Sequence, residues 1–206
     1  ALNYKSGDAF LKEAKGRSNK MAFFIDSSGR SYTLLANSLP SARGQGEPLT
    51  GRLTPPIGAE FIDVVMGDDE QLVILSSDAG YGFISTLGDL QSKTKSGKHA
   101  ITLSKEAKTM RLTKVQNLES DYLAVITNRA RLLIFQVSEL PHLSKGKGNK
   151  LINIKTDDFV AKEEFLIGLC IIKENQKLRV EYGNGKKHKQ YSFSDLVNFT
   201  SHRARK

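Results

Sequence analysis

The chain has 206 residues, of which 39% are hydrophobic and 26% charged, a composition typical of soluble globular proteins. No apolar stretch approaches the roughly 20 residues that a membrane-spanning helix needs, and no signal-peptide pattern is present. A single cysteine excludes an internal disulfide. Lys and Arg number 31 against 22 Asp and Glu, a formal net charge of +9. This surplus points to a polyanionic partner, of which nucleic acid is the commonest.

The most informative feature is a hairpin pattern that recurs four times. Each copy joins two short runs of β-prone residues through a turn of mostly small and polar residues, which predicts an antiparallel hairpin. Ahead of them, Asn3 and Tyr4 together with residues 8–14 are interpreted as the last two strands of an earlier, incomplete copy. The predicted hairpins span residues 21–35, 72–84, 122–135 and 178–193.

The spacing between copies stays regular beyond the hairpins. A polar-polar-Leu unit follows each hairpin, with leucines 51, 50 and 56 residues apart: Leu39, Leu90, Leu140 and Leu196. A loop glycine then recurs at intervals of 51 residues: Gly46, Gly97 and Gly148. Third strands are predicted at 49–53, 100–103 and 151–154, and fourth strands at 60–65, 109–115 and 164–172. The one window with a helical pattern is 104–110.

Four antiparallel strands in each unit of about 50 residues are typical of a propeller blade. We therefore predict an all-β fold, one domain over residues 1–206, in which each blade covers the apolar faces of its neighbours. Either the two incomplete ends pair to close a ring, or the chain is an excised piece of a longer protein. The predicted blades are 20–66, 71–116 and 121–173, flanked by partial blades at 1–19 and 176–206.

Many of the basic residues gather in the loops between the second and third predicted strands. Residues 91–104 and 144–150 contain several lysines and no acid. Equivalent loops of successive blades lie on one rim, so we expect a continuous positive surface that binds phosphates without reading base sequence. Glycines beside the lysines are expected to let backbone N–H groups approach phosphate oxygens. The predicted nucleic-acid contacts are Arg43, Arg52, Lys93, Lys95, Lys98, Lys145, Lys147, Lys150, Lys186, Lys187, Lys189, Arg203 and Arg205.

Three stretches carry a resemblance to a known family. They read DSSGRSYTLLANSLPSARGQGEPLTG at 26–51, SSDAGYGF at 76–83 and LPHLSKGKGNKLINI at 140–154. Together they resemble the C-terminal domain of the A subunit of bacterial topoisomerase IV. The related gyrase domain carries a basic box, QRRGGKG, which residues 42–46 and 145–148 match only in part. This difference favours the topoisomerase IV type and argues against tight, gyrase-style chiral wrapping of DNA.

The resemblance implies a five-bladed, often open β-propeller, or β-pinwheel, with incomplete terminal blades in this chain. It implies a non-catalytic domain that binds and bends duplex DNA, helps present the transported segment, and sets topological preference in decatenation and supercoil relaxation. DNA cleavage and the use of ATP and Mg²⁺ are implied for other parts of an A2B2 type II topoisomerase, so no cofactor is expected here.

The implied partners are duplex DNA, bound mostly without sequence preference, the B subunit, and the rest of the A subunit. A bacterial condensin is a further candidate partner. The implied location is the bacterial cytoplasm at the nucleoid, with the periphery of the inner membrane a further candidate for the full-length protein.

The residues leave a second class of function open, because propellers often act as docking platforms and a fold does not fix a function. The positive rim would then bind an acidic or chromosome-organising protein. Catalysis is not indicated: the four histidines lie in loops or basic runs without ligand spacing, and no nucleophile elbow or phosphate-binding loop appears. Cys170, in the apolar run 166–172, is expected to be buried. We expect no catalytic or metal-binding residue and no small-molecule substrate.

Overall fold

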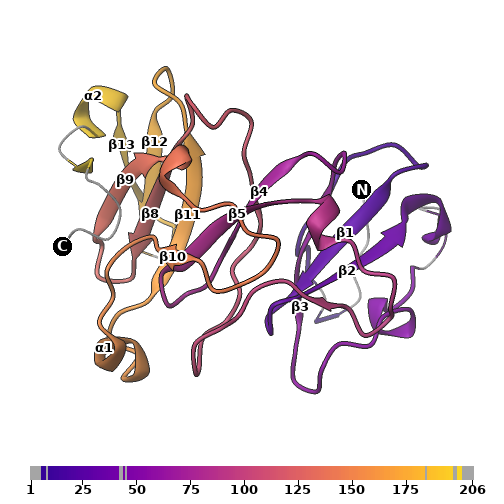
Figure 1. Cartoon of the computed structure of the whole chain (residues 1–206). Helices are drawn as coiled ribbons and strands as arrows, with labels where there is room; N and C mark the ends of the chain where they lie inside the picture. Colours follow the sequence, from indigo (N-terminus) through magenta and orange to yellow (C-terminus); the bar gives the residue numbers. More distant parts are fainter. Residues whose placement is uncertain are drawn as a thin grey trace.

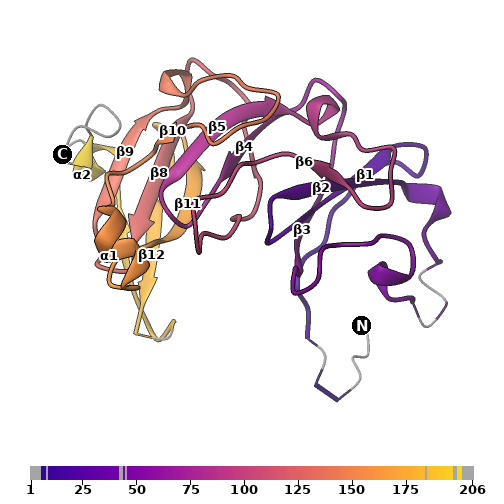
Figure 2. The same cartoon turned by 60° about the horizontal axis from the view of Figure 1, so that its bottom comes forward.

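The computed structural model describes residues 6–7, 9–41, 44, 46–183, 185–196 and 199–200. Most of the regular structure in this part of the chain is β, as the sequence predicts. The strands form antiparallel sheets that follow one another along an arc (Figures 1 and 2). No helix among the described residues is long and apolar enough to span a membrane.

Each sheet is built around one predicted hairpin. The first sheet has the order β3 (Phe61–Met66), β1 (Met21–Asp26), β2 (Arg30–Leu35), β6 (Lys98–His99). The second has the order β10 (Asn149–Lys150), β5 (Tyr81–Thr86), β4 (Leu72–Ser76), β7 (Thr113–Lys114). The third has the order β11 (Leu166–Ile172), β8 (Tyr122–Thr127), β9 (Leu132–Gln136), and the fourth pairs β12 (Leu178–Tyr182) with β13 (Lys187–Tyr191).

The outer strand of a four-stranded sheet comes from the following repeat. β6 pairs with β2 of the first hairpin, and β10 pairs with β5 of the second. The expectation that the third strands lie at 100–103 and 151–154, within their own units, was therefore wrong. The ladder residues lie just before these apolar segments, whose side chains fill the space between blades. Residues 49–53 also form no strand, and 49–51 make a short 3-10 helix after Pro48.

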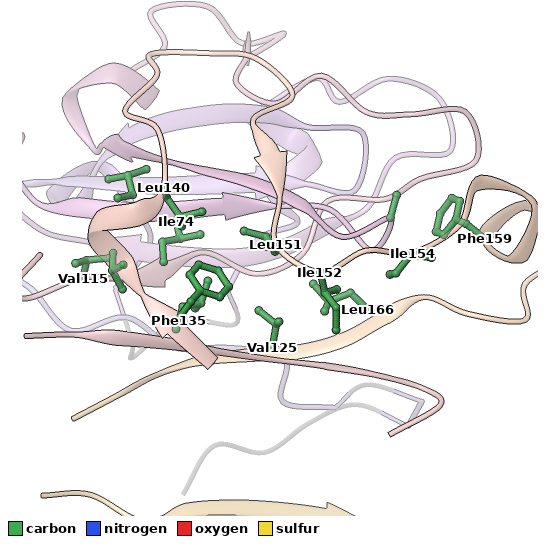
Figure 3. Close-up of a cluster of buried hydrophobic side chains, with 14 residues drawn as sticks. Ile74, Val115, Val125, Phe135, Leu140, Leu151, Ile152, Ile154, Phe159 and Leu166 are labelled. Carbon is green, nitrogen blue, oxygen red and sulfur yellow. The ribbon is translucent and has the colours of Figure 1, made fainter. Parts of the chain in front are cut away.

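Alternate residues of a central strand pack against opposite neighbours. In β4, Val73 and Leu75 belong to a buried cluster shared with the first sheet, whereas Ile74 belongs to one shared with the third sheet. In β8, Val125 faces this second cluster (Figure 3), and Ala124 packs in a third cluster with the β12–β13 hairpin. Because successive side chains of a strand point to opposite faces, each blade requires a neighbour on both sides.

The polar-polar-Leu units mark short helical turns that follow each hairpin. They are the 3-10 helices Ala36–Ser38, Gly88–Leu90 and Val137–Glu139, and the short helix α2 (Phe193–Leu196). The leucines Leu90, Leu140 and Leu196 are buried in the clusters between blades. The regular spacing of these leucines therefore has a packing cause.

Three further expectations from the sequence were wrong. Residues 104–110 form no helix; they contain a turn in which Glu106 has a positive φ of 64°. A strand was expected over residues 8–14, but residues 9–14 form none, while Asn3, Tyr4 and Asp8 lie outside the described residues. Cys170 is exposed, because β11 is an edge strand that contacts no further strand of its own sheet. One short helix, α1 (Thr156–Val160), was not predicted.

Candidate nucleic-acid interface

The two acid-free basic loops lead directly into β6 and β10. We call these the swapped strands, because each pairs with a strand of the preceding repeat. After β6, the N–H of Ala100 donates to the carbonyl oxygen of Gly29 at 2.9 Å. After β10, the N–H of Leu151 donates to the carbonyl oxygen of Gly80 at 2.7 Å. Each basic loop is thus held against the outer side of the preceding blade, next to the turn of its hairpin (Figure 2).

The first basic loop brings Lys93 and Lys95 to Arg52 of the preceding repeat. The three residues line a shallow cavity of about 290 Å³, and the N–H of Thr54 donates to the carbonyl oxygen of Lys95 at 2.8 Å. Arg52 pairs with Glu47. At the end of the loop, the Lys98 ammonium donates to the carbonyl oxygen of Asp89 at 2.8 Å.

The second basic loop lies against the second blade. The Lys147 ammonium lies 4.0 Å from the centre of the Tyr81 ring, a cation–π contact that fixes its position. Lys150, opposite Tyr81 in the β10–β5 ladder, donates to the Asn153 side chain at 2.7 Å. Lys145 is exposed.

The two loops are connected through backbone contacts. Gly146 forms a parallel bridge with Ile101, and the N–H of Thr102 donates to the carbonyl oxygen of Gly146 at 2.8 Å. Lys145 and Lys147 therefore flank the strand segment that continues from Lys98. The structure thus places seven of the predicted contacts in or beside the two connected basic loops: Arg52, Lys93, Lys95, Lys98, Lys145, Lys147 and Lys150.

The other predicted contacts are placed differently or lie outside the description. Lys187 and Lys189 belong to β13 and Lys186 to the turn before it, a position equivalent to the hairpin turns of the other sheets. Their exposed side chains are therefore not in loops of the same kind. Arg43, Arg203 and Arg205 lie outside the described residues.

The loop glycines have a packing role that differs from the one expected. Gly97 and Gly148 have φ of 71° and 75°, a conformation that favours glycine. A Cβ at Gly97 would overlap the Tyr32 ring, and one at Gly148 would overlap the carbonyl oxygen of Gly82. The N–H of Gly97 donates to the carbonyl oxygen of Thr94 at 3.1 Å, so it serves the loop itself. The N–H of Gly97 is therefore already used within the loop, and the expectation that N–H groups beside the loop glycines approach phosphate stays a prediction.

Three residues just after the hairpin turns were missed. Arg30 donates to the carbonyl oxygens of Ser96 and Gly97 at 3.0 and 3.3 Å and so holds the first basic loop. Tyr81 holds Lys147 of the second loop. Arg131 donates to the carbonyl oxygen of Asn153 at 3.0 Å. A long side chain follows the hairpin turn in each of the three repeats, at positions 30, 81 and 131. This recurrence in the sequence could have indicated these residues as contacts of the basic loops.

Several acids of the domain are buried away from the basic loops. Asp63 and Glu164 are 3% and 2% exposed, and Asp26 and Asp121 are fully buried. Burial raises the pKa of the Asp63 carboxyl above its usual value. Among the described residues, no carboxylate lies within ion-pair distance of Lys93, Lys95 or Lys145. Within the same residues, no group of three or more His, Cys, Asp or Glu could hold a metal ion.

The fold and this surface define a class: a β-propeller of strand-swapped blades with basic loops along its outer side. The family described as DNA gyrase C-terminal domain, beta-propeller, matches residues 71–115 and 121–162. A solved structure titled as the Escherichia coli ParC C-terminal domain superposes with a TM-score of 0.90 at 43% identity, covering 98% of this chain and 81% of that one. A DNA gyrase A C-terminal domain shares the fold at a TM-score of 0.71 and 13% identity, covering 99% and 64%.

Curated relatives give the same assignment. The A subunit of DNA topoisomerase 4 from Pseudomonas aeruginosa is 47% identical over 205 residues, which is 100% of this chain and 27% of the relative. Its counterpart from Escherichia coli K12 is 46% identical over 185 residues, covering 90% and 24%. The chain belongs to the family of C-terminal domains of the topoisomerase IV A subunit, as the sequence resemblance implies. It spans about a quarter of the length of these curated relatives.

Proposed function

We propose that this chain is the DNA-binding and DNA-bending domain of a type IIA topoisomerase, and that it engages duplex DNA through the two swapped basic loops. The observation that carries the proposal is that Lys93, Lys95 and Lys145 are exposed, on loops of two consecutive repeats whose sequences contain no acid. Family membership and the charge of +9 support it. Phosphate contacts of this kind give affinity and orientation without base readout.

The arrangement of the loops supports the proposal that the domain bends DNA. Two basic loops on successive blades of an arc contact more phosphates on a curved duplex than on a straight one, which offsets the elastic cost of about 1–6 kcal/mol for bending a short site. In the assembly, the domain would help present the transported segment and set topological preference during decatenation and supercoil relaxation. The partial match to the gyrase box supports bending without tight chiral wrapping.

The proposal assigns the remaining steps to other parts of an A2B2 assembly. DNA cleavage, ATP hydrolysis and Mg²⁺ binding would take place in the B subunit or in the rest of the A subunit, with no cofactor needed here. The protein would act in the bacterial cytoplasm at the nucleoid.

The test is duplex binding as a function of salt. We expect log K to fall linearly with log salt, with a slope of about −0.9 for each phosphate contacted. Replacing Lys93, Lys95 and Lys145 with Gln should make the slope less steep by about 2–3 and weaken binding to all sequences alike. A matched control replaces Lys105, Lys155 and Lys177, exposed lysines outside these loops, and should change the slope by less than about 1.

Two results would overturn the proposal. Salt-independent binding, or none near 50 mM salt, would favour docking of an acidic partner protein. Equal losses in both triple variants would show that DNA contacts general surface charge.

Energy transfer between dyes on the two ends of a duplex of about 30 base pairs tests bending. Unchanged energy transfer when the duplex is saturated with protein would exclude bending.

A further inference from the structure

The inner strands β3, β7 and β11 of three sheets face a common cavity. This central cavity has a volume of about 570 Å³ and is lined by residues 12–15, 64–66, 111–114 and 169–171. The three strands are all at the edge of their sheets, and residues 12–15 line the cavity beside them. The central cavity therefore lies at the edges of the sheets opposite to the swapped strands: β6 and β10 form the outer edges of the first and second sheets.

Four cations line the central cavity: Lys12, Lys15, Arg111 and Lys114. Among the described residues, the only carboxylates within ion-pair distance of them are Asp63, 3.9 Å from Lys12, and the exposed Glu13, 4.0 Å from Lys15.

Arg111 and Lys114 instead donate to backbone carbonyl oxygens. Arg111 donates to Leu11 at 3.4 Å, and Lys114 to Met66 at 2.5 Å. A carbonyl oxygen orients a cation without neutralising it, so the cavity keeps a surplus of positive charge.

The walls between these cations are apolar. Val65 and Leu112 are 6% and 7% exposed, and Leu169 and Ile171 are partly buried beside them. Edge strands are also the usual place at which an extended peptide adds main-chain hydrogen bonds. A site with cations, apolar walls and strand edges suits an extended segment in which acidic and apolar side chains alternate.

Duplex DNA does not fit this cavity. A volume of about 570 Å³ corresponds to about 8 Å in each direction, which holds two or three residues of an extended chain at about 3.3 Å each but not a double helix, whose major groove alone is roughly 12 Å wide. A small anion fits, but it would leave the apolar walls in contact with water. We propose that the central cavity binds an acidic, extended peptide segment of a partner protein, separately from the DNA-binding loops.

Cys170 provides a direct measurement, since it lines the central cavity and is the only cysteine of the chain. The probe is a capped hexapeptide of alternating aspartate and valine, and the readout is the alkylation rate of Cys170 by neutral iodoacetamide. Although Cys170 is exposed, the surrounding protein partly desolvates its thiol and raises the thiol pKa, so the rate is best measured near pH 9. We expect saturating acidic peptide to slow alkylation about fivefold or more, and a lysine–valine peptide to leave it unchanged.

Variants separate the cavity from the basic loops. Arg111→Gln should raise the peptide concentration for half-protection about tenfold, whereas Lys93→Gln with Lys95→Gln should leave it within about twofold. DNA affinity should show the reverse pattern, so failure of one proposal does not imply failure of the other. Arg111 is exposed, and Lys15→Gln provides a second cavity variant if Arg111→Gln unfolds.

Three results would overturn the inference. No protection at about 1 mM peptide would mean binding weaker than about −4 kcal/mol. Equal loss of protection in cavity and loop variants would place the peptide on general surface charge. Protection by inorganic phosphate at the same concentration would show that the cavity selects small anions instead of a peptide.

Discussion

The N–H of Leu151 lies 2.7 Å from the carbonyl oxygen of Gly80, a hydrogen bond that joins the third repeat to the hairpin turn of the second. The equivalent bond, from Ala100 to Gly29, joins the second repeat to the first. The first two blades are therefore each completed by the next repeat, and the basic loops lie where these connections cross. Structure and charge in this domain follow the same period of about 50 residues.

Replacing Gly148 with Ala should destabilise the protein strongly. Its φ is 75°, and an added Cβ would overlap the carbonyl oxygen of Gly82, so the β10–β5 connection must shift. Gly185→Ala is the matched control, since φ is 76° there and nothing lies within 4 Å of the added Cβ. The control should cost about 1–2 kcal/mol, and Gly148→Ala at least about 2 kcal/mol more. Thermal melting of both variants measures the difference, and equal costs would refute the close-approach argument.

The repeat predicted the blades because apolar alternation depends on nearby residues that the sequence displays. It did not predict the strand swap. The apolar residues Ile101 and Leu151 looked like strand centres, yet they fill the space between blades while the polar residues before them form the ladder. Which edge a short strand joins depends on contacts between distant segments. A local sequence pattern therefore does not predict which sheet edge a short strand joins.

The candidate site was predicted in part for the same reason. Lys93 and Lys145 were found because their loops repeat, whereas Lys187 differs because it lies in a hairpin. Arg30 was overlooked because its role, binding a loop of the next repeat, exists only in the swapped fold. Cys170 was expected to be buried because its sequence neighbours are apolar. They do not indicate that β11 is at the edge of its sheet and faces the central cavity.

Tyr32→Phe should cost about 1.5–3 kcal/mol, because the buried hydroxyl donates a 2.6 Å hydrogen bond to the Asp26 carboxylate. Burial, together with this bond, raises the pKa of Tyr32 well above its usual value. A raised pKa gives stability that is present below the unfolded value, about 10, and is lost as pH rises above it.

The stability difference between the native protein and Tyr32→Phe should therefore shrink above pH 10 or so. Urea unfolding from about pH 7 to 11 measures it. Tyr81→Phe is the control. A difference that is constant with pH would contradict the assignment.

Asp63 should make stability fall as pH rises from about 4. Burial raises the pKa of this carboxyl, although it accepts hydrogen bonds from the N–H groups of Val64 and Leu112 at 2.9 Å. The folded state then holds the proton to higher pH than the unfolded state, so the contribution to stability is present at low pH and is lost through the folded pKa. Relative to Asp63→Asn, the native protein should lose stability as pH rises above about 4.

Asp68 should make stability depend on pH in the opposite direction to Asp63. Its hydrogen bond with Lys20 lowers the pKa of Asp68, so its contribution is present above the unfolded pKa and lost as pH falls. Asp68→Asn should therefore give a small dependence in the reverse direction, small because both side chains are exposed. Urea unfolding at each pH measures both variants, and parallel profiles for the two would contradict the assignment of Asp63.

Arg30→Gln should weaken DNA binding although Arg30 is not a proposed phosphate contact. The guanidinium bridges the carbonyl oxygens of Ser96 and Gly97, so its loss frees the loop that presents Lys93 and Lys95. We expect amide hydrogen exchange in residues 91–97 to accelerate and the dissociation constant for duplex DNA to rise about three- to tenfold.

The control for this prediction is Arg179→Gln, which removes the same charge from an exposed arginine of β12, outside both basic loops. It should leave hydrogen exchange in 91–97 unchanged and raise the dissociation constant by less than about twofold. If Arg30→Gln behaves like this control in both measurements, the loop does not depend on Arg30 for its conformation. If affinity falls while exchange stays unchanged, Arg30 acts through its charge, and its role is that of a direct phosphate contact.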